Sequence, residues 1–180
     1  QLEIPHPERQ PIMWDNPEVQ PHSAALGKSF GYKGEQLELL DFEATPHVLI
    51  SGTTGSGKST LLQVLLTSLC QSTPPSELRL VLIDMKNEDL PPFAKLPHVQ
   101  EVATTGESAA RLLTWVRDEK DRRVASGGKK HQRIVLVIDE LAELTSTLKE
   151  QNVKSNVFGS ILAIGRSKSI NVIAATQKPL

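Results

Sequence analysis

The residues best suited to chemistry lie in one glycine-rich stretch, Gly52-Thr53-Thr54-Gly55-Ser56-Gly57-Lys58-Ser59, which is followed by Thr60. The spacing Gly-x4-Gly-Lys-Ser is that of a P-loop, whose backbone N–H groups surround the phosphates of a nucleotide. Lys58 would pair with the β- and γ-phosphate oxygens, and the Ser59 hydroxyl would ligate Mg²⁺. A glycine-rich turn without a ligand is the alternative, but the strand pattern before the loop and the helical pattern after it favour the P-loop. We therefore predict that residues 52–60 bind ATP with Mg²⁺.

The second half of the candidate site is Ile134-Val135-Leu136-Val137-Ile138-Asp139-Glu140, an apolar run that ends in two acids. In an open α/β sheet, ligands lie outside the carboxyl ends of the strands, so these acids and the glycine loop are expected to converge. Asp139 would hold Mg²⁺ through its water shell, and Glu140 would orient and deprotonate the attacking water. The alternative is a strand that ends at a solvated acidic turn. Beside a P-loop, ATP hydrolysis is the favoured interpretation.

Two polar residues later in the chain would complete this chemistry. Gln177 follows the apolar run 171–176, and its amide could contact the γ-phosphate and report its loss. Arg166 follows an apolar helical stripe and could neutralise transition-state charge at a neighbouring subunit's nucleotide, as an arginine finger. Each also has a simpler interpretation: Gln177 as a surface side chain, and Arg166 as the cover of its helix end. The spacing alone leaves these alternatives open.

An α/β framework is needed to bring these residues together. Apolar runs rich in Val, Ile and Leu predict four strands buried on both faces of a parallel sheet, at 47–51, 79–84, 134–139 and 171–176. Three helical stripes alternate with them, namely Leu61, Leu62, Leu65, Leu66 and Leu69, then Ala109, Leu112, Leu113 and Val116, then Phe158, Ile161, Leu162 and Gly165. The second stripe follows Thr104-Thr105-Gly106-Glu107, a capping-box pattern. The alternation predicts right-handed βαβ units.

Composition limits the class of protein. No apolar run reaches the roughly 18 residues of a membrane span, and the single Cys70 excludes an internal disulfide and favours a cytoplasmic location. The formal net charge of -1 argues against a broad basic face, so DNA contact would depend on a few local cations. Residues 1–25 hold five of the twelve prolines and predict an extended arm or linker. The first residue is Gln1, which suggests a processed segment with any anchor upstream.

Four motifs in order resemble the FtsK/SpoIIIE-type translocases, in the HerA-FtsK branch of additional-strand P-loop motors. The family's entry strand and P-loop are similar to LGKSFGYKGEQLELLDFEATPHVLISGTTGSGKS. Its next strand resembles ELRLVLIDMKNEDLPPFAKLPHV, with Asp84, Lys86 and Pro97-His98 in register. Its Walker B segment resembles IVLVIDELAEL, and its finger and sensor segment resembles AIGRSKSINVIAATQKP. Met85 stands where the family has the proline of its Asp-Pro-Lys motif.

This resemblance implies a three-layer P-loop NTPase with a mainly parallel, RecA-like sheet, in which the strand before Gln177 lies between the P-loop and Walker B strands. It also implies self-association into a hexameric ring, with ATP at subunit interfaces, Arg166 acting in trans and double-stranded DNA in the central channel. The candidate pore loop is 145–155, where Lys149 and Lys154 would contact DNA phosphates. A solvated loop is an almost equally good interpretation of these lysines.

The resemblance covers residues 26–180, interpreted as an ATPase core that lacks the family's later motor strands and its winged-helix domain. The expected location is cytoplasmic, at the inner face of the membrane if an upstream segment anchors the protein. Two other functions remain open. Type VII secretion ATPases move proteins, but they tend to carry an aromatic residue after the Asp-Glu pair, where this chain has Leu141-Ala142. A nucleotide-binding assembly module without turnover is the other alternative.

Overall fold

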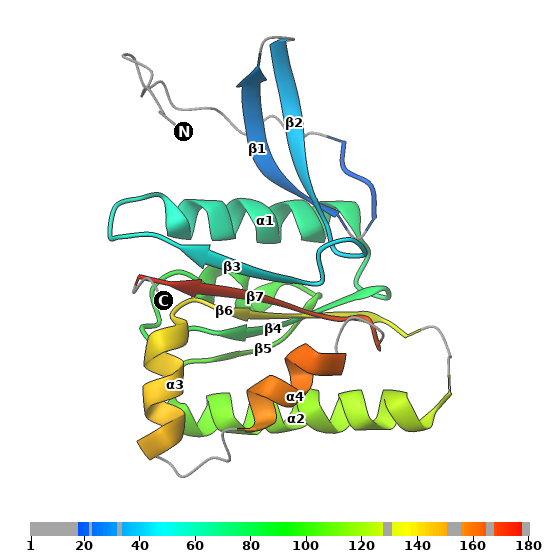
Figure 1. Cartoon of the computed structure of the whole chain (residues 1–180), viewed down its shortest axis with the longest axis vertical. Helices are drawn as coiled ribbons and strands as arrows, with labels where there is room; N and C mark the ends of the chain where they lie inside the picture. The colour runs from blue at the N-terminus through cyan, green and yellow to red at the C-terminus, as the bar shows by residue number, and fades with distance from the viewer. Residues whose placement is uncertain are drawn as a thin grey trace.

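The computed structural model describes residues 18–21, 23–31, 34–127, 131–150, 156–164 and 168–177, and it shows a hairpin followed by alternating strands and helices (Figure 1). The elements are β1 (Ser23–Gly31), β2 (Gly34–Asp41), β3 (His47–Ser51), α1 (Lys58–Ser72), β4 (Leu78–Ile83), the 3-10 helix η1 (Pro91–Lys95), β5 (Val99–Ala103), α2 (Gly106–Ala125), β6 (Arg133–Ile138), α3 (Leu141–Glu150), α4 (Asn156–Ile164) and β7 (Ile170–Thr176). The four predicted strands are present as β3, β4, β6 and β7, each within one residue of its predicted bounds. The prediction of an α/β fold is confirmed.

The main sheet is parallel, with the strand order β3-β7-β6-β4-β5. β7 pairs with β3 on one side and with β6 on the other. The strand before Gln177 therefore lies between the P-loop strand and the strand before Asp139, as the resemblance implied. Because the strands are parallel, the segments that follow them emerge at the same edge of the sheet, and this edge carries the candidate site.

Helices cover both faces of this sheet and produce a three-layer arrangement, with α1 on one face and α2, α3 and α4 on the other (Figure 1). Residues of β6 alternate between the two cores. Val135 and Val137 pack in the cluster that contains Leu65 of α1, whereas Leu136 and Ile138 pack in the cluster that contains residues of α2, α3 and α4. Full burial of such a side chain stabilises the fold by about 1.5–3 kcal/mol. None of the helices in the described ranges combines the length and apolar character needed to cross a membrane.

β1 and β2 form a separate antiparallel hairpin that lies on the outer side of α1 (Figure 1). Ala24 and Ala25 are fully buried, and the Ala25 N–H donates to Ser68 Oγ of α1 at 2.8 Å. The expected boundary between an arm at 1–25 and a core at 26–180 therefore falls inside β1. Residues 1–17 lie outside the described part of the chain, so the extended arm there stays a prediction.

Two local features differ from the sequence expectations. β5 is an edge strand that pairs only with β4 among the described strands, and it exposes Gln100. Its sequence has no continuous apolar run, so the hydrophobic pattern does not predict this strand. The capping box of α2 is shifted by one residue. Thr105 is the N-cap and forms the reciprocal bonds with Ser108, in place of the expected pair of Thr104 and Glu107.

The candidate pore loop at 145–155 is helical in its first half, so the expectation of a loop over 145–150 is wrong. α3 extends to Glu150, and the Thr145 hydroxyl donates to the Leu141 carbonyl one turn earlier at 2.9 Å. The helix continues because Leu144 and Leu148 keep its apolar face on the core beneath the sheet. Lys149 is exposed in the last turn of α3, and Lys154 lies outside the described residues.

Candidate nucleotide-binding site

The predicted phosphate-binding loop connects β3 to α1 at the carboxyl edge of the sheet. Gly55 and Gly57 have φ values of 79° and 89°, a left-handed conformation that side chains disfavour. Gly57 is the N-cap of α1, and no side chain among the described residues caps this helix. The N–H groups of its first turn are thus available to an anion. The Gly52 N–H ties the loop to the sheet by donating to the Thr176 carbonyl at 3.2 Å.

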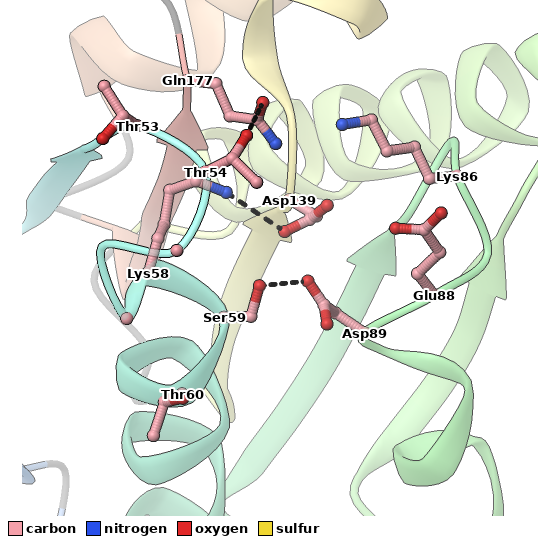
Figure 2. A pocket seen from close by; sticks show the side chains of 12 residues that line it. Thr53, Thr54, Lys58, Ser59, Thr60, Lys86, Glu88, Asp89, Asp139 and Gln177 are labelled. Carbon is pink, nitrogen blue, oxygen red and sulfur yellow. Dashed lines mark hydrogen bonds and ion pairs between the residues drawn. The ribbon is translucent and has the colours of Figure 1, made fainter.

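A pocket of about 340 Å³ lies against this loop (Figure 2). Its lining consists of Thr53, Thr54, Gly55, Gly57, Lys58, Ser59 and Thr60 from the P-loop and α1, with Lys86, Glu88, Asp89, Asp139 and Gln177 from the other segments. Of the predicted nucleotide-binding residues, Gly52 and Ser56 do not line it. Ser56 supports the turn instead, because its N–H donates to the Thr53 carbonyl at 3.1 Å.

Lys58 and Asp139 face each other across the pocket, with Nζ and Oδ1 at 3.9 Å (Figure 2). Asp139 is only 4% exposed, and its Oδ1 accepts no hydrogen bond from the described part of the chain. Burial raises the pKa of Asp139 to about 6, although the nearby Lys58 charge opposes this shift. A buried carboxylate oxygen without a donor, beside the Ser59 hydroxyl, is suited to Mg²⁺, which prefers oxygen ligands. The predicted pair of Ser59 and Asp139 therefore fits this metal ion.

Two acids that the sequence analysis did not select also line the pocket. Glu88 and Asp89 lie in the segment after β4, and the Ser59 hydroxyl donates to Asp89 Oδ2 at 2.5 Å (Figure 2). The sequence gives one indication that Glu88 and Asp89 lie near the site: they follow closely after strand β4, which ends just before Asp84. It does not indicate which of the two acids reaches the P-loop, because that depends on how the segment folds.

Glu140 does not line the pocket; it is hydrogen-bonded to the end of β7. Its Oε1 accepts from the Thr176 hydroxyl at 2.8 Å, and its Oε2 accepts from the Gln177 N–H at 3.0 Å. Burial acts to raise the pKa of Glu140, but the hydrogen bonds from Thr176, Gln177 and Ala142 outweigh it and hold the pKa below its ordinary value. Glu140 is therefore a carboxylate at neutral pH, the form that a general base requires.

Gln177 lines the pocket, and its contact with the γ-phosphate stays a prediction. It is half-buried, and its Oε1 accepts a hydrogen bond from Thr54 Oγ1 of the P-loop at 3.2 Å (Figure 2). The side chain of Gln177 thus contacts the phosphate-binding loop while its backbone N–H binds Glu140. Arg166 lies outside the described residues, so its role stays a prediction.

Comparison with known proteins identifies the family. The family model of the FtsK/SpoIIIE family matches residues 13–127. The chain belongs to the FtsK/SpoIIIE family. Among curated relatives in this family, the DNA translocase SftA of Bacillus subtilis is 34% identical over 88% of this chain and 18% of its own length. The DNA translocase FtsK of Borreliella burgdorferi is 32% identical over 86% of this chain and 22% of its own length. The chain therefore spans about a fifth of these relatives, and the prediction of its family is confirmed.

Solved structures of P-loop ATPases share the fold. The pCW3 conjugation coupling protein TcpA, in a monomer form with ATPγS, has a TM-score of 0.71 at 24% identity, over 93% of this chain and 52% of that chain. ATPases 2 and 3 of Thermomonospora curvata EccC, in complex with a signal sequence peptide, have a TM-score of 0.72 at 19% identity, over 92% of this chain and 32% of that chain. At these identities the likeness concerns the fold alone, and it confirms the P-loop ATPase architecture.

Proposed function

We propose that this chain binds ATP with Mg²⁺ in the pocket against the P-loop and hydrolyses it. The observation that carries the proposal is the meeting of an uncapped helix N-terminus and Lys58 with a buried Asp139 oxygen that accepts no hydrogen bond within the described residues. The first two attract phosphate, and the third suits a divalent cation. Membership of the FtsK/SpoIIIE family supports this assignment, as does the shared fold of TcpA, which was solved with ATPγS.

Lys58 would pair with the β- and γ-phosphate oxygens, which carry more negative charge than the single carboxylate of Asp139. When Lys58 turns to phosphate, the buried Asp139 needs another positive partner, and this supports binding of the cation together with the nucleotide. Bound Mg²⁺ supplies charge neutralisation at the phosphates, and Ser59 and Asp139 are the residues that would hold it.

Glu140 is proposed as the general base that accepts a proton from the attacking water. To reach the pocket its carboxylate must leave the Thr176 hydroxyl and the Gln177 N–H. Gln177 is suited to trigger this release, because its side chain bonds to Thr54, and Thr54 lies in the loop that the phosphates would contact. Loss or gain of the γ-phosphate would then be transmitted through Gln177 to the base.

We further propose that the complete protein is a ring-shaped motor, hexameric, that moves double-stranded DNA. The relatives SftA and FtsK are named DNA translocases. Thr53, Thr54, Lys86 and Glu88 are exposed at the rim of the pocket, which leaves this side available to a neighbouring subunit that would contribute Arg166. Lys149 and Lys154 are proposed to contact DNA phosphates. A few such cations in each subunit, repeated around a ring, are compatible with the net charge of -1.

The proposed location is the cytoplasm, at the inner face of the membrane if an upstream segment anchors the protein. Protein translocation is the rival function, since EccC has the same fold and was solved with a signal sequence peptide. The relatives at 30% identity or more that are named DNA translocases favour DNA.

The test is ATP hydrolysis by the full chain with and without duplex DNA. We expect DNA to stimulate hydrolysis, and Glu140→Gln to retain ATP binding while hydrolysis falls at least ~100-fold, the contribution expected of a general base. Glu143→Gln is the matched control, because Glu143 lies in the first turn of α3 and does not line the pocket. Hydrolysis that survives Glu140→Gln would refute the role of the base.

Two other results would replace the proposed function. Stimulation by a signal sequence peptide and not by DNA would identify a protein-translocating ATPase. ATP that stays intact on the chain after long incubation with Mg²⁺ and DNA would identify an assembly module without turnover.

A further inference from the structure

The segment after β4 is folded around one buried carboxylate, that of Asp84. Asp84 is fully buried, and it accepts hydrogen bonds from five successive backbone N–H groups. Its Oδ1 accepts from Lys86 and Asn87 at 3.1 and 2.8 Å, and its Oδ2 accepts from the next three residues, 88–90, at 3.0 Å each. Both oxygens of the Asp84 carboxylate therefore bind the backbone of this segment, and Asp84 does not line the pocket.

The wrapped segment fixes which acid meets the P-loop. Glu88 is exposed and points into the pocket from the same side as Lys86, whereas Asp89 is half-buried and lies directly against Ser59 (Figure 2). The Asp89 backbone N–H is anchored on Asp84, and its side-chain Oδ2 accepts the Ser59 hydroxyl proton at 2.5 Å.

This contact determines what the Ser59 hydroxyl presents to the pocket. A hydroxyl has one proton to donate and two lone pairs that can accept a proton or bind a cation. Because the proton of Ser59 points to Asp89, its lone pairs are free for a cation in the pocket. If the Ser59 hydroxyl could rotate freely, its proton would also point toward the pocket for part of the time, and the lone pairs would then face away from the cation.

We propose that Asp89 is a positioning residue of the divalent-cation site: it orients the Ser59 hydroxyl so that the oxygen lone pairs face the cation. The inference rests on the proposed function and adds a residue to it. A second observation points to a cation here independently of the two acids of the segment. Asp139 lines the same pocket, is 4% exposed, and carries an Oδ1 that accepts no hydrogen bond in the described part of the chain.

The affinity for nucleotide without a cation and the affinity for the cation should respond differently to loss of Asp89, whereas a general loss of structure would reduce both. Binding of nucleotide without a cation depends on the backbone N–H groups of the P-loop and on Lys58. In the described part of the chain the Asp89 side chain is hydrogen-bonded to the Ser59 hydroxyl and to neither of these. The added affinity from a cation depends on its ligands and on the groups that orient them. Loss of such an orienting group typically weakens metal affinity by about 10–100-fold.

The experiment measures binding of a fluorescent ATP analogue to the full chain, first in EDTA and then during titration with Mn²⁺. We expect Asp89→Ala to weaken the apparent Mn²⁺ affinity by about 10–100-fold, while affinity for the analogue in EDTA changes less than ~2-fold. Asp89→Asn should lie between Asp89→Ala and the wild type, because its amide oxygen still accepts the Ser59 proton. Glu88→Ala is the matched control, since Glu88 is an acid of the same pocket without a side-chain bond to Ser59 in this structure. It should lose less Mn²⁺ affinity than Asp89→Ala.

Several results would overturn the inference. These are wild-type Mn²⁺ affinity in Asp89→Ala, tighter Mn²⁺ binding in that variant, an equal loss in Glu88→Ala, and a parallel loss of binding in EDTA. If Asp89→Ala does not fold by circular dichroism, Asp89→Asn with Mn²⁺ affinity as in the wild type or better overturns it as well. A wild-type chain that binds the analogue under neither condition would instead refute the proposed function, so the two failures are distinguishable.

Discussion

Asp139→Asn should stabilise the chain in metal-free buffer, and the gain should depend on pH. Burial raises the pKa of Asp139 from 3.8 to about 6, so the folded chain holds this proton more tightly than the unfolded chain does. Between these values the folded state binds more protons, and stability therefore falls as pH rises. At about 1.4 kcal/mol per pKa unit, the charged Asp139 costs about 3 kcal/mol of folding free energy above the folded pKa.

The measurement is urea unfolding of the wild type and Asp139→Asn in EDTA, followed by circular dichroism from about pH 4 to about pH 7.5. Other carboxylates titrate in both proteins, so the difference between the two free energies of unfolding isolates Asp139. The variant should be more stable by up to about 3 kcal/mol near neutral pH, and the gap should close as the pH falls toward 4.

A direct control comes from Lys58, whose charge lowers the pKa of Asp139 in opposition to burial. In a Lys58→Met background, the difference in stability between chains with and without Asp139→Asn should reach its full size only at a higher pH, because the pKa of Asp139 rises further when the Lys58 charge is removed. A gap between the wild type and Asp139→Asn that is constant across this range, or that widens toward acidic pH, would refute the reasoning.

Two further predictions concern the core of the fold. Leu113→Ala should destabilise the chain by about 2–5 kcal/mol in urea unfolding, because Leu113 is fully buried beneath the sheet. The control is Val124→Ala on the same helix, whose side chain is 46% exposed; it should cost less than ~1 kcal/mol. Equal losses of stability in the two variants would contradict the described packing of α2. Burial also raises the pKa of Cys70 to about 11 from 9.0, so alkylation at about pH 8 should be about 100-fold slower in the folded chain than in urea. Equal rates would contradict the partial burial of this thiol beside η1.

Several parts of the site could be predicted from the sequence because they depend on local chemistry. The P-loop needs glycines at positions with φ of 79° and 89°, and a lysine and serine at the start of the next helix. These requirements are met by residues adjacent in the chain, so spacing alone locates them. The strands β4, β6 and β7 were equally predictable, since each is largely buried on both faces and has a nearly continuous apolar run. β3 has a similar apolar run and was predicted at its observed bounds, but as an edge strand it is not buried on both faces, and Leu49 is 47% exposed.

Other features were not predictable because they depend on contacts between distant segments. β5 is an edge strand with an exposed Gln100, so its pairing with β4 leaves little trace in hydrophobicity. The helical start of the expected pore loop follows from the packing of Leu144 and Leu148 on the core, which outweighs the polar residues between them. The strand order was implied by the family resemblance, and the residues by themselves did not supply it.

The sequence by itself determined the chemistry that the molecule has available: a P-loop, two adjacent acids after an apolar strand, and membership of the FtsK/SpoIIIE family. Only the tertiary structure decided how those groups are used. It turned Glu140 toward Thr176 and away from the pocket, and it placed Asp89 against Ser59, 30 residues earlier in the chain. The physical reason is that both arrangements depend on hydrogen bonds and burial created when parallel strands bring their carboxyl ends to one edge, a condition that no single stretch of sequence contains.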